Sequence, residues 1–564
     1  MIDPIPKTTK AQISRAALQR LYITMRHLFI RGYYKPLGVS GESMISALLD
    51  LEPEIYGSIA DTEKVELNGL HYVFQRLPQG IEECQYLKLI SREGFEGASG
   101  FTPLVPAKRR RDCYRIDEEH MYIEMTRGRS DVYDVLTHLT FMYVEAEKIR
   151  RHALDHRGNK RRRWLLLEEI IKKIESRKKF NKEVGYTHLS TLLGRTYQEI
   201  ADAAVLFDKT DRVNSLFSIV YWLGQLSINE FKDKVDREIS FSSTLRDKLG
   251  MHIFGAIWAH NIKEKLDEAQ LLGKELHIVS ANLHSIMNSF YAIDALKSKK
   301  PFGEVMEQLS TNKSKRKKVK DFALKKGMLE YNDNSGTNID VQIFDLSKIK
   351  ITHLPKELKA CAKKEKLNNQ VLLVMDYAFG EQAYECMDEL LKPYECRVGN
   401  DEKKLMLNVK SINIMGKAGI LKGQKGDIIV PTSHVFEGTA DNYPFKNGLK
   451  ANDFEDSGVD VYTGSMITVL GTSLQNKDIL RYFLRSSWKA AGLEMEGAHY
   501  QKAIQSASHI RNSISKNVAL RYAYYASDNP LKTGSTLASG GLGVGGVRPT
   551  YAITLAILKG ILNR

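Results

Sequence analysis

Apolar residues recur at steps of three and four positions through the first half of the chain, from about Ala11 to Leu296. This spacing places apolar side chains on one face of a helix, and residues 164–171 and 213–226 are clear examples. Helix-forming residue types dominate the same region. We therefore predict that residues 1–296 form a mainly α-helical region, with a long loop over residues 91–117, where glycine, proline and a basic run break the pattern.

A different pattern follows residue 296. Residues 297–369 contain a basic run at 313–318, a polar, turn-forming stretch at 332–336 and a short β-like run at 341–344. From residue 370 onward, aliphatic runs at 371–375, 411–415 and 427–430 alternate with helical segments. Such alternation is typical of an α/β domain with a largely buried sheet. We predict a basic linker with a small α/β segment over 297–369, and an α/β domain over 370–564 with a mixed central sheet flanked by helices.

Composition narrows the class of protein. The 564 residues, of which 43% are hydrophobic and 27% charged, are enough for several globular domains. The five cysteines are widely spaced, and no Cys/His cluster has metal-ligand spacing, so we expect a reducing compartment and neither a metal nor a cofactor. The N-terminus lacks the apolar core of a secretory signal and no run of 18 apolar residues occurs, which predicts a cytoplasmic protein without a membrane partner.

The formal charge of +15 attracts polyanions in general, so nucleotides, nucleic acid and acidic membranes all fit its sign. The basic runs at 108–111, 160–163 and 313–318 have no interleaved aromatic residues. They are therefore more typical of solvated faces than of a nucleic-acid-binding surface.

Four segments of the last third point to a specific chemistry. They are residues 416–421 with the following 426–431, the triplet-containing segment 493–498, the segment 525–531 and the glycine-rich run 545–550 before a last helix. In order and character they resemble the nucleoside phosphorylase and nucleosidase superfamily, which cleaves the bond between a base and ribose. The Ser-Asp-x-Pro-Leu of the third segment is most similar to AMP nucleosidase. The resemblance covers about residues 370–564 and implies the nucleoside phosphorylase-like fold there.

The resemblance implies two carboxyl groups with different roles. Cleavage of an N-glycosidic bond builds positive charge on the sugar and negative charge on the departing base. Glu496 matches the ribose-binding carboxylate, with Met495 on the sugar face and Glu494 in the same triplet. Asp528 matches the group that gives a proton to the leaving purine, and this role requires a protonated acid in a dry pocket.

Further residues are implied around these two. The segment Gly416 to Gly419 resembles a turn whose backbone approaches a sugar or an anion, so we include Ala418 and Gly419 in the site. Lys417 stands where relatives carry a small hydroxyl or neutral residue, and its cation could hold a phosphate that is either free or on the 5′ carbon. Glu381 loosely matches a glutamate that activates water; the alternative is a carboxylate at a helix start.

Other candidates are weaker. Phe436 could stack on a purine or pack in the core, and His434 could touch the ribose. Ser527 and Asn529 flank Asp528 and could reach the base or a phosphate. Arg548 closes a glycine-rich run before Pro549, which fits a lid with the arginine aimed at phosphate or, equally, a surface linker.

We expect hydrolysis of a purine nucleotide or nucleoside by a homo-oligomeric enzyme, since relatives often assemble into trimers or hexamers. Phosphorolysis is the close alternative. It needs a closed phosphate site that is usually built by arginines, and no arginine directly follows the strand at Gly416. A non-catalytic purine nucleotide sensor, which signals through the helical half, is the third reading.

Overall fold

The computed structural model describes residues 9–94, 100–208, 215–398, 401–439, 441–533 and 542–563. The chain forms two compact units. Unit 1 comprises residues 1–126, 131–251 and 473–479, and unit 2 comprises residues 127–130, 252–472 and 480–564. The predicted boundaries after residues 296 and 369 both lie inside unit 2. No helix in the described ranges combines the length and the apolar content needed to cross a lipid bilayer.

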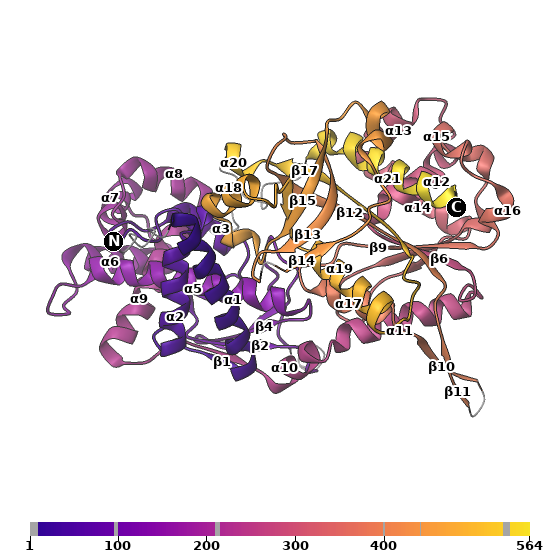
Figure 1. Ribbon diagram of the computed structural model, residues 1–564. Coiled ribbons are helices and arrows are strands. Elements are labelled where there is room, and N and C mark those ends of the chain that lie inside the picture. The colour runs from indigo at the N-terminus through magenta and orange to yellow at the C-terminus, as the bar shows by residue number, and fades with distance from the viewer. Residues whose placement is uncertain are drawn as a thin grey trace, which may run out of the picture. The chain divides into compact units, whose positions relative to one another are not determined.

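Unit 1 is rich in helices, in line with the pattern of its sequence (Figure 1). Its helices are α1 (Lys10–Arg31), α2 (Val39–Leu51), α3 (Leu67–Phe74), α5 (Arg129–Ala153, from residue 131 on), α6 (Arg162–Glu175), α7 (Lys182–Leu193), α8 (Tyr197–Phe207), α9 (Ser215–Asp233) and α10 (Ser243–Gly250).

Unit 1 also contains a sheet that the sequence pattern did not predict. Its strand order is β1-β5-β2-β4-β3, with β2 parallel to both β4 and β5. The strands are β1 (Tyr33–Tyr34), β2 (Tyr86–Ile90), β3 (Cys113–Arg115), β4 (His120–Glu124) and β5 (Glu238–Phe241). They span two to five residues, too few for a period of two to stand out among helical segments. β3 lies within the predicted loop over 91–117.

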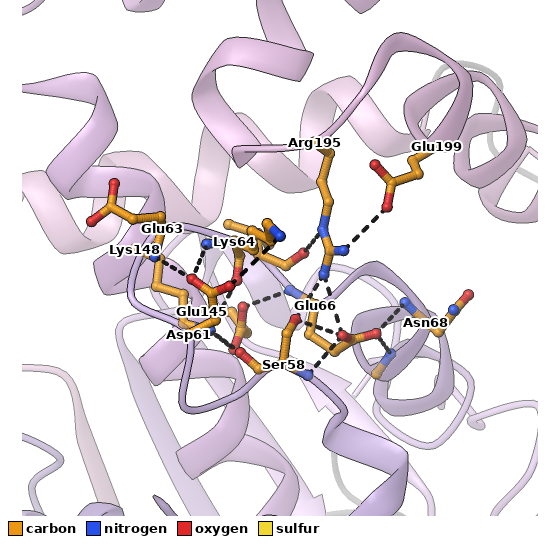
Figure 2. Close-up of polar contacts among 12 residues, drawn as sticks. Ser58, Asp61, Glu63, Lys64, Glu66, Asn68, Glu145, Lys148, Arg195 and Glu199 are labelled. Carbon is orange, nitrogen blue, oxygen red and sulfur yellow. Dashed lines mark hydrogen bonds and ion pairs between the residues drawn. The ribbon is translucent and has the colours of Figure 1, made fainter. Parts of the chain in front are cut away.

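A network of buried polar groups joins the helices of unit 1 (Figure 2). The Glu66 carboxylate accepts hydrogen bonds from the backbone N–H of Ser58 at 3.0 Å and from the Arg195 guanidinium at 3.3 Å. The backbone N–H of Glu66 donates in turn to Glu145 Oε2 at 2.8 Å. Lys148 Nζ lies 2.9 Å from Glu145 Oε1 and also donates to two backbone carbonyls. Burial raises the pKa of Glu145 to about 7, although Lys148 opposes the shift.

We expect Lys148→Met to destabilise unit 1 by about 3 kcal/mol, because removal of one member of a buried pair leaves the other uncompensated. In the variant the pKa of Glu145 rises further above its unfolded value, so the folded state binds more protons than the unfolded state over a wider range. The deficit relative to wild type should therefore grow as pH rises from about 5 to about 8. Urea unfolding at both pH values measures it. Lys64→Met removes an exposed lysine of the same region and should change stability by about 0.5 kcal/mol or less.

Unit 2 is built around a ten-stranded mixed sheet (Figure 1). Its main path runs β14-β13-β15-β16-β12-β6-β9-β8-β7, and β17 pairs with β12 and β13. The strands are β6 (Glu275–Ser280), β7 (Leu329–Tyr331), β8 (Val341–Asp345), β9 (Gln370–Met375), β12 (Val409–Ile420), β13 (Ile428–Phe436), β14 (Asn442–Pro444), β15 (Val461–Thr468), β16 (Gly492–Glu494) and β17 (Ala519–Asp528). A separate hairpin joins β10 (Tyr394–Val398) to β11 (Asp401–Leu405). The predicted mixed sheet flanked by helices is present, but β6, β7 and β8 come from before residue 370, where the prediction began it.

Strand β6 shows why the predicted boundaries do not match the units. It comes from the region expected to be helical, yet it lies between β12 and β9 and runs parallel to both. The strands beside it begin about 95 and 135 residues later in the chain, so the sheet draws the preceding segments into the same unit.

Helices cover both faces of this sheet, so its strands are apolar on both sides. In β9 the side chains of Val371, Leu373 and Met375 enter one core, with α11, α17 and α19, whereas Leu372 and Val374 enter the other, with α12, α13, α14 and α21. The helices of unit 2 are α11 (Ile253–Glu268), α12 (Leu283–Leu296), α13 (Phe302–Thr311), α14 (Lys313–Lys325), α15 (Lys356–Lys359), α16 (Lys364–Leu367), α17 (Gln382–Leu390), α18 (Lys477–Arg485, from residue 480 on), α19 (Gly497–Gln505), α20 (Pro530–Thr533) and α21 (Val547–Leu562).

Candidate functional site

A cavity of about 180 Å³ lies just beyond the ends of β6 and β9 and beside β12. Two of the predicted site residues, Lys417 and Glu496, line it together. Tyr377, Tyr500 and Tyr524 contribute further walls. We call this space the Glu496 cavity.

The segment Gly416 to Gly419 forms this wall differently from the expectation. It continues strand β12, with an irregular register between Ala418 and Gly419, and is not a turn. A Cβ atom at Gly416 would lie 2.7 Å from the Tyr524 ring, so the glycine permits close packing of neighbouring strands. Ala418 is buried and its carbonyl accepts a hydrogen bond from Ser527.

Glu496 is held by the loop that follows β9. Its Oε1 accepts a hydrogen bond from the backbone N–H of Gly380 at 3.0 Å. Gly380 has φ +56, and a Cβ atom there would lie 2.5 Å from Ser130 Oγ, so this position requires glycine. Met495 is buried, and its Cε would lie 3.9 Å from the same Cβ atom. The loop thus brings Glu496, Met495 and the residue after Gly380, Glu381, to one place.

Glu494 has a different environment from Glu496. Its carboxylate accepts hydrogen bonds from Thr468 Oγ1 at 2.5 Å, from the backbone N–H of Glu496 at 2.5 Å, and from the backbone N–H of Gly497. These contacts hold the start of α19 against the end of β15. Glu494 therefore positions Glu496, and we do not find it among the residues that line the Glu496 cavity.

The two glutamates influence each other's protonation. Burial raises the pKa of Glu494, and burial together with the Glu494 carboxylate raises the pKa of Glu496. Glu494 accepts hydrogen bonds from Thr468 and two backbone N–H groups, whereas Glu496 is bonded by the backbone of Gly380 and Met495 and is repelled by Glu494, so the negative charge is better stabilised on Glu494. Glu496 is the member of the pair that more readily holds a proton.

Asp528 closes strand β17 on the other side of β12. In the sheet, Gly419 faces Asp528 on β17 and Leu493 on β16, so the strand end with Asp528 and the Glu494–Glu496 segment flank the same part of β12. Asp528 is not among the residues that line the Glu496 cavity. Lys417 lies near both the Glu496 cavity and Asp528, because it lines that cavity and its charge interacts with Asp528.

The Asp528 carboxyl is 5% exposed and its Oδ1 accepts a hydrogen bond from Ser527 Oγ at 2.5 Å. Its Oδ2 is buried without a hydrogen-bond partner within the described ranges. Burial raises the pKa of Asp528, against the lowering effects of Ser527, Lys417 and Lys425. A buried carboxyl with one oxygen unsatisfied favours the protonated form.

Glu381 meets two side chains that sequence reasoning missed. Arg129 Nη2 lies 2.5 Å from Glu381 Oε1, and Ser130 Oγ accepts a hydrogen bond from the Glu381 backbone N–H at 2.9 Å. The Arg127 guanidinium stands over the Phe379 ring at 5.1 Å and lowers the pKa of Glu496. These residues come from the short segment 127–130, which belongs to unit 2 although its neighbours in sequence belong to unit 1. A local sequence pattern cannot predict these contacts, because Arg129 and Ser130 are about 250 residues away from Glu381 in the chain.

The remaining candidates serve the scaffold. Phe436 is buried, and its ring packs edge-on against His499 at 5.2 Å. His434 is buried in the core, where it stacks on Phe445 at 5.2 Å, so it does not reach a ribose. Asn529 is committed to backbone groups, including the Gly423 carbonyl at 2.9 Å.

Arg548 lies away from the Glu496 cavity. Its Nε donates to the Ser457 carbonyl at 2.7 Å, in a different groove along α21. Residues 540 and 541 of the predicted lid lie outside the described residues. Arg548 therefore does not reach a phosphate in the Glu496 cavity, contrary to the expectation from the sequence.

Comparison with protein families assigns the chain to one family. Two segments, residues 42–300 and 304–563, match the family model described as "Family of unknown function (DUF6909)". Together they span most of the sequence, and the chain belongs to this family. The chain matches no curated protein.

Several solved structures are similar to parts of this chain. One is AMP nucleosidase from Bacteroides thetaiotaomicron VPI-5482, at 14% identity over 54% of this chain and 97% of that chain, with a TM-score of 0.29. Another is futalosine hydrolase of Helicobacter pylori strain 26695, at 11% identity over 51% and 98%, with a TM-score of 0.30. A third is uridine phosphorylase from Schistosoma mansoni, at 13% identity over 52% and 90%, with a TM-score of 0.30. At such identities and TM-scores, likeness establishes no activity for this chain.

Proposed function

We propose that unit 2 is an N-glycosidase that cleaves the base–ribose bond of a purine nucleotide or nucleoside by hydrolysis, similar to AMP nucleosidase. The observation that carries this proposal is the loop Phe379–Glu381, whose Gly380 N–H donates to Glu496 and whose next residue is Glu381, while Lys417 lines the cavity and its charge interacts with Asp528. Glu496 and Asp528 thus flank the same part of β12 in different environments, as the two carboxyl roles of the reaction require.

In this proposal Glu496 binds ribose. Its carboxylate has one oxygen fixed by Gly380 and borders a cavity, so it can accept hydrogen bonds from sugar hydroxyls. The hydroxyl groups of a bound ribose donate to this carboxylate, which stabilises its ionised form. Negative charge there also stabilises the cationic sugar of the transition state.

Asp528 acts as the acid that protonates the leaving base. Its raised pKa provides the proton, and Ser527 fixes the orientation of the carboxyl through Oδ1. Met495 packs on the sugar face, and Lys417 contributes positive charge on the side of the cavity toward Asp528.

Glu381 activates the attacking water. The Arg129 guanidinium lies 2.5 Å from the Glu381 carboxyl, and Ser130 anchors the backbone of the same residue. A carboxyl whose position is fixed from two sides is suited to orient a water molecule and to accept its proton.

Phosphorolysis is the second candidate, because Arg127 and Arg129 add two guanidinium groups to this edge, and planar guanidinium groups bind phosphate well. In that case inorganic phosphate takes the place of water at the sugar.

Base release from AMP, adenosine and inosine, followed by chromatography with and without phosphate, tests these readings. The proposal expects free base without phosphate. Release only with phosphate would identify a phosphorylase instead. Ligand binding without any release would leave a nucleotide sensor and overturn the enzymatic proposal.

A further inference from the structure

A second, larger cavity of about 370 Å³ lies in unit 2 next to the Glu496 cavity. It is bordered by the first turns of α12 and α21, by the end of α13 and by α14. Tyr377 lies between the two spaces, since it lines the Glu496 cavity and its side chain lies beside Asn282 and Tyr525, which line the larger one. We call the larger space the α12–α21 cavity.

The lining of the α12–α21 cavity favours an anion. Two helices, α12 of 14 residues and α21 of 16 residues, direct their N-terminal ends to it. Helix N-termini carry partial positive charge, which favours an anion such as phosphate. Arg316 adds a full positive charge, and none of the described lining residues is acidic.

A buried side chain in the wall indicates that a polar ligand belongs there. Asn288 is 2% exposed and its Nδ2 donates to Tyr551 Oη at 2.8 Å, whereas its Oδ1 has no hydrogen-bond partner within the described ranges. In either orientation of the amide, Tyr551 satisfies one end and the other end is left to the cavity. A buried polar group without a partner destabilises the fold, and a bound polar ligand would supply the missing hydrogen bond.

We propose that the α12–α21 cavity binds the 5′-phosphate of the substrate, so that the enzyme acts on a nucleoside monophosphate in preference to a nucleoside. This inference rests on the proposed function and names its substrate class. The Glu496 cavity alone, at about 180 Å³, is smaller than the usual range of ligand pockets, whereas the α12–α21 cavity reaches that range. The ribose lies in the former and its phosphate in the latter, with Tyr377 at the junction.

Arg316 is the main determinant in this proposal. Its Nη1 donates to the Leu309 and Ser310 carbonyls at the end of α13, which fixes the side chain at the cavity wall. Its neighbour Lys317 is exposed and does not line the cavity. The basic run therefore divides into an inward arginine and solvated lysines.

Calorimetric titration of the full chain with ribose 5-phosphate and with ribose tests the site. We expect wild type to bind ribose 5-phosphate at least about 10-fold more tightly than ribose, and Arg316→Met to remove most of that difference. Lys317→Met is the matched control and should behave as wild type. Since Arg316 also supports α13, Ser310→Asp provides a second variant, which adds negative charge at the wall and should abolish the preference without removing the arginine.

Equal binding of both sugars by wild type, or an unchanged preference in both Arg316→Met and Ser310→Asp, would overturn the phosphate site. Base release distinguishes this failure from that of the proposed function. If bases are released equally from AMP and adenosine, the glycosidase remains and the phosphate site is wrong. If ribose 5-phosphate binds through Arg316 but no base is ever released, the phosphate site remains and the glycosidase is wrong.

Discussion

Replacement of Glu496 by glutamine should lower kcat/KM for base release by about 100-fold, because it removes about 3 kcal/mol of charge-assisted hydrogen bonding to ribose. The neutral amide keeps the size of the side chain, and its carbonyl oxygen can still accept the hydrogen bond from the Gly380 N–H. Binding of a ribose-containing ligand should weaken accordingly, while binding of the free base should change little. Steady-state kinetics and titration with adenosine and adenine measure both effects.

The pH dependence provides an independent check of Glu496. Its pKa is raised by burial and by Glu494, so in the free enzyme the ionised form increases as pH rises through neutrality. kcat/KM should therefore rise with pH over this range in wild type, and Glu496→Gln should lose that rise. Equal weakening of adenosine and adenine binding would contradict the ribose assignment.

Glu385→Gln is the matched control for Glu496→Gln. Glu385 lies on α17, is buried, and has a pKa raised well above its usual value by burial and by Glu381. A carboxyl that is already neutral resembles the amide that replaces it. Activity and its pH dependence should stay as in wild type.

Local pattern predicted the strands of unit 2 that are apolar on both faces. β9 is buried at each of its six positions, and a continuous apolar run of this length bounded by polar residues indicates a central strand. β6 escaped the same reasoning because it is preceded and followed by helices, and its partners come much later in the chain. Pairing between distant strands decides the unit boundary, and no window of sequence contains both partners.

The same distinction between local motifs and distant contacts separates the residues of the candidate site that could be predicted from those that could not. Glu496, Met495 and Asp528 could be proposed because their motifs are short and contiguous. Arg129 and Ser130 could not, since their role depends on a loop 250 residues away.

Arg316 illustrates a third case. The sequence shows the basic run, but it does not show which of its cations lies on the side of the helix that faces the cavity. The run at 313–318 begins α14, and its helical period turns one of its cations to the cavity while Lys317 and Lys318 face solvent. Only the position of α13 and α21 around that helix determines which cation is enclosed.

The role proposed for Asp528 sets requirements on both its protonation state and its position. A general acid must hold a proton at the working pH and must present it to the leaving group. Burial raises the pKa of Asp528, Ser527 occupies Oδ1, and Oδ2 is left for the proton. Lys417 and Lys425 act in the opposite sense and keep the pKa from rising further.

Asp528→Asn should therefore reduce kcat by about 100- to 10,000-fold while ligand affinity stays near that of wild type, since the amide retains size and a hydrogen-bond donor but cannot transfer a proton. In wild type the rate should fall as pH rises through the raised pKa of Asp528 and the carboxyl loses its proton, and the variant should lack this fall. Lys417→Met should move the fall to higher pH, because removal of a nearby cation raises the pKa of the carboxyl. Stopped assays of base release across pH, with parallel titrations of affinity, measure these effects. Wild-type turnover in Asp528→Asn would remove this residue from the mechanism and leave Glu381 and Glu496 to act on a base that departs without protonation from Asp528.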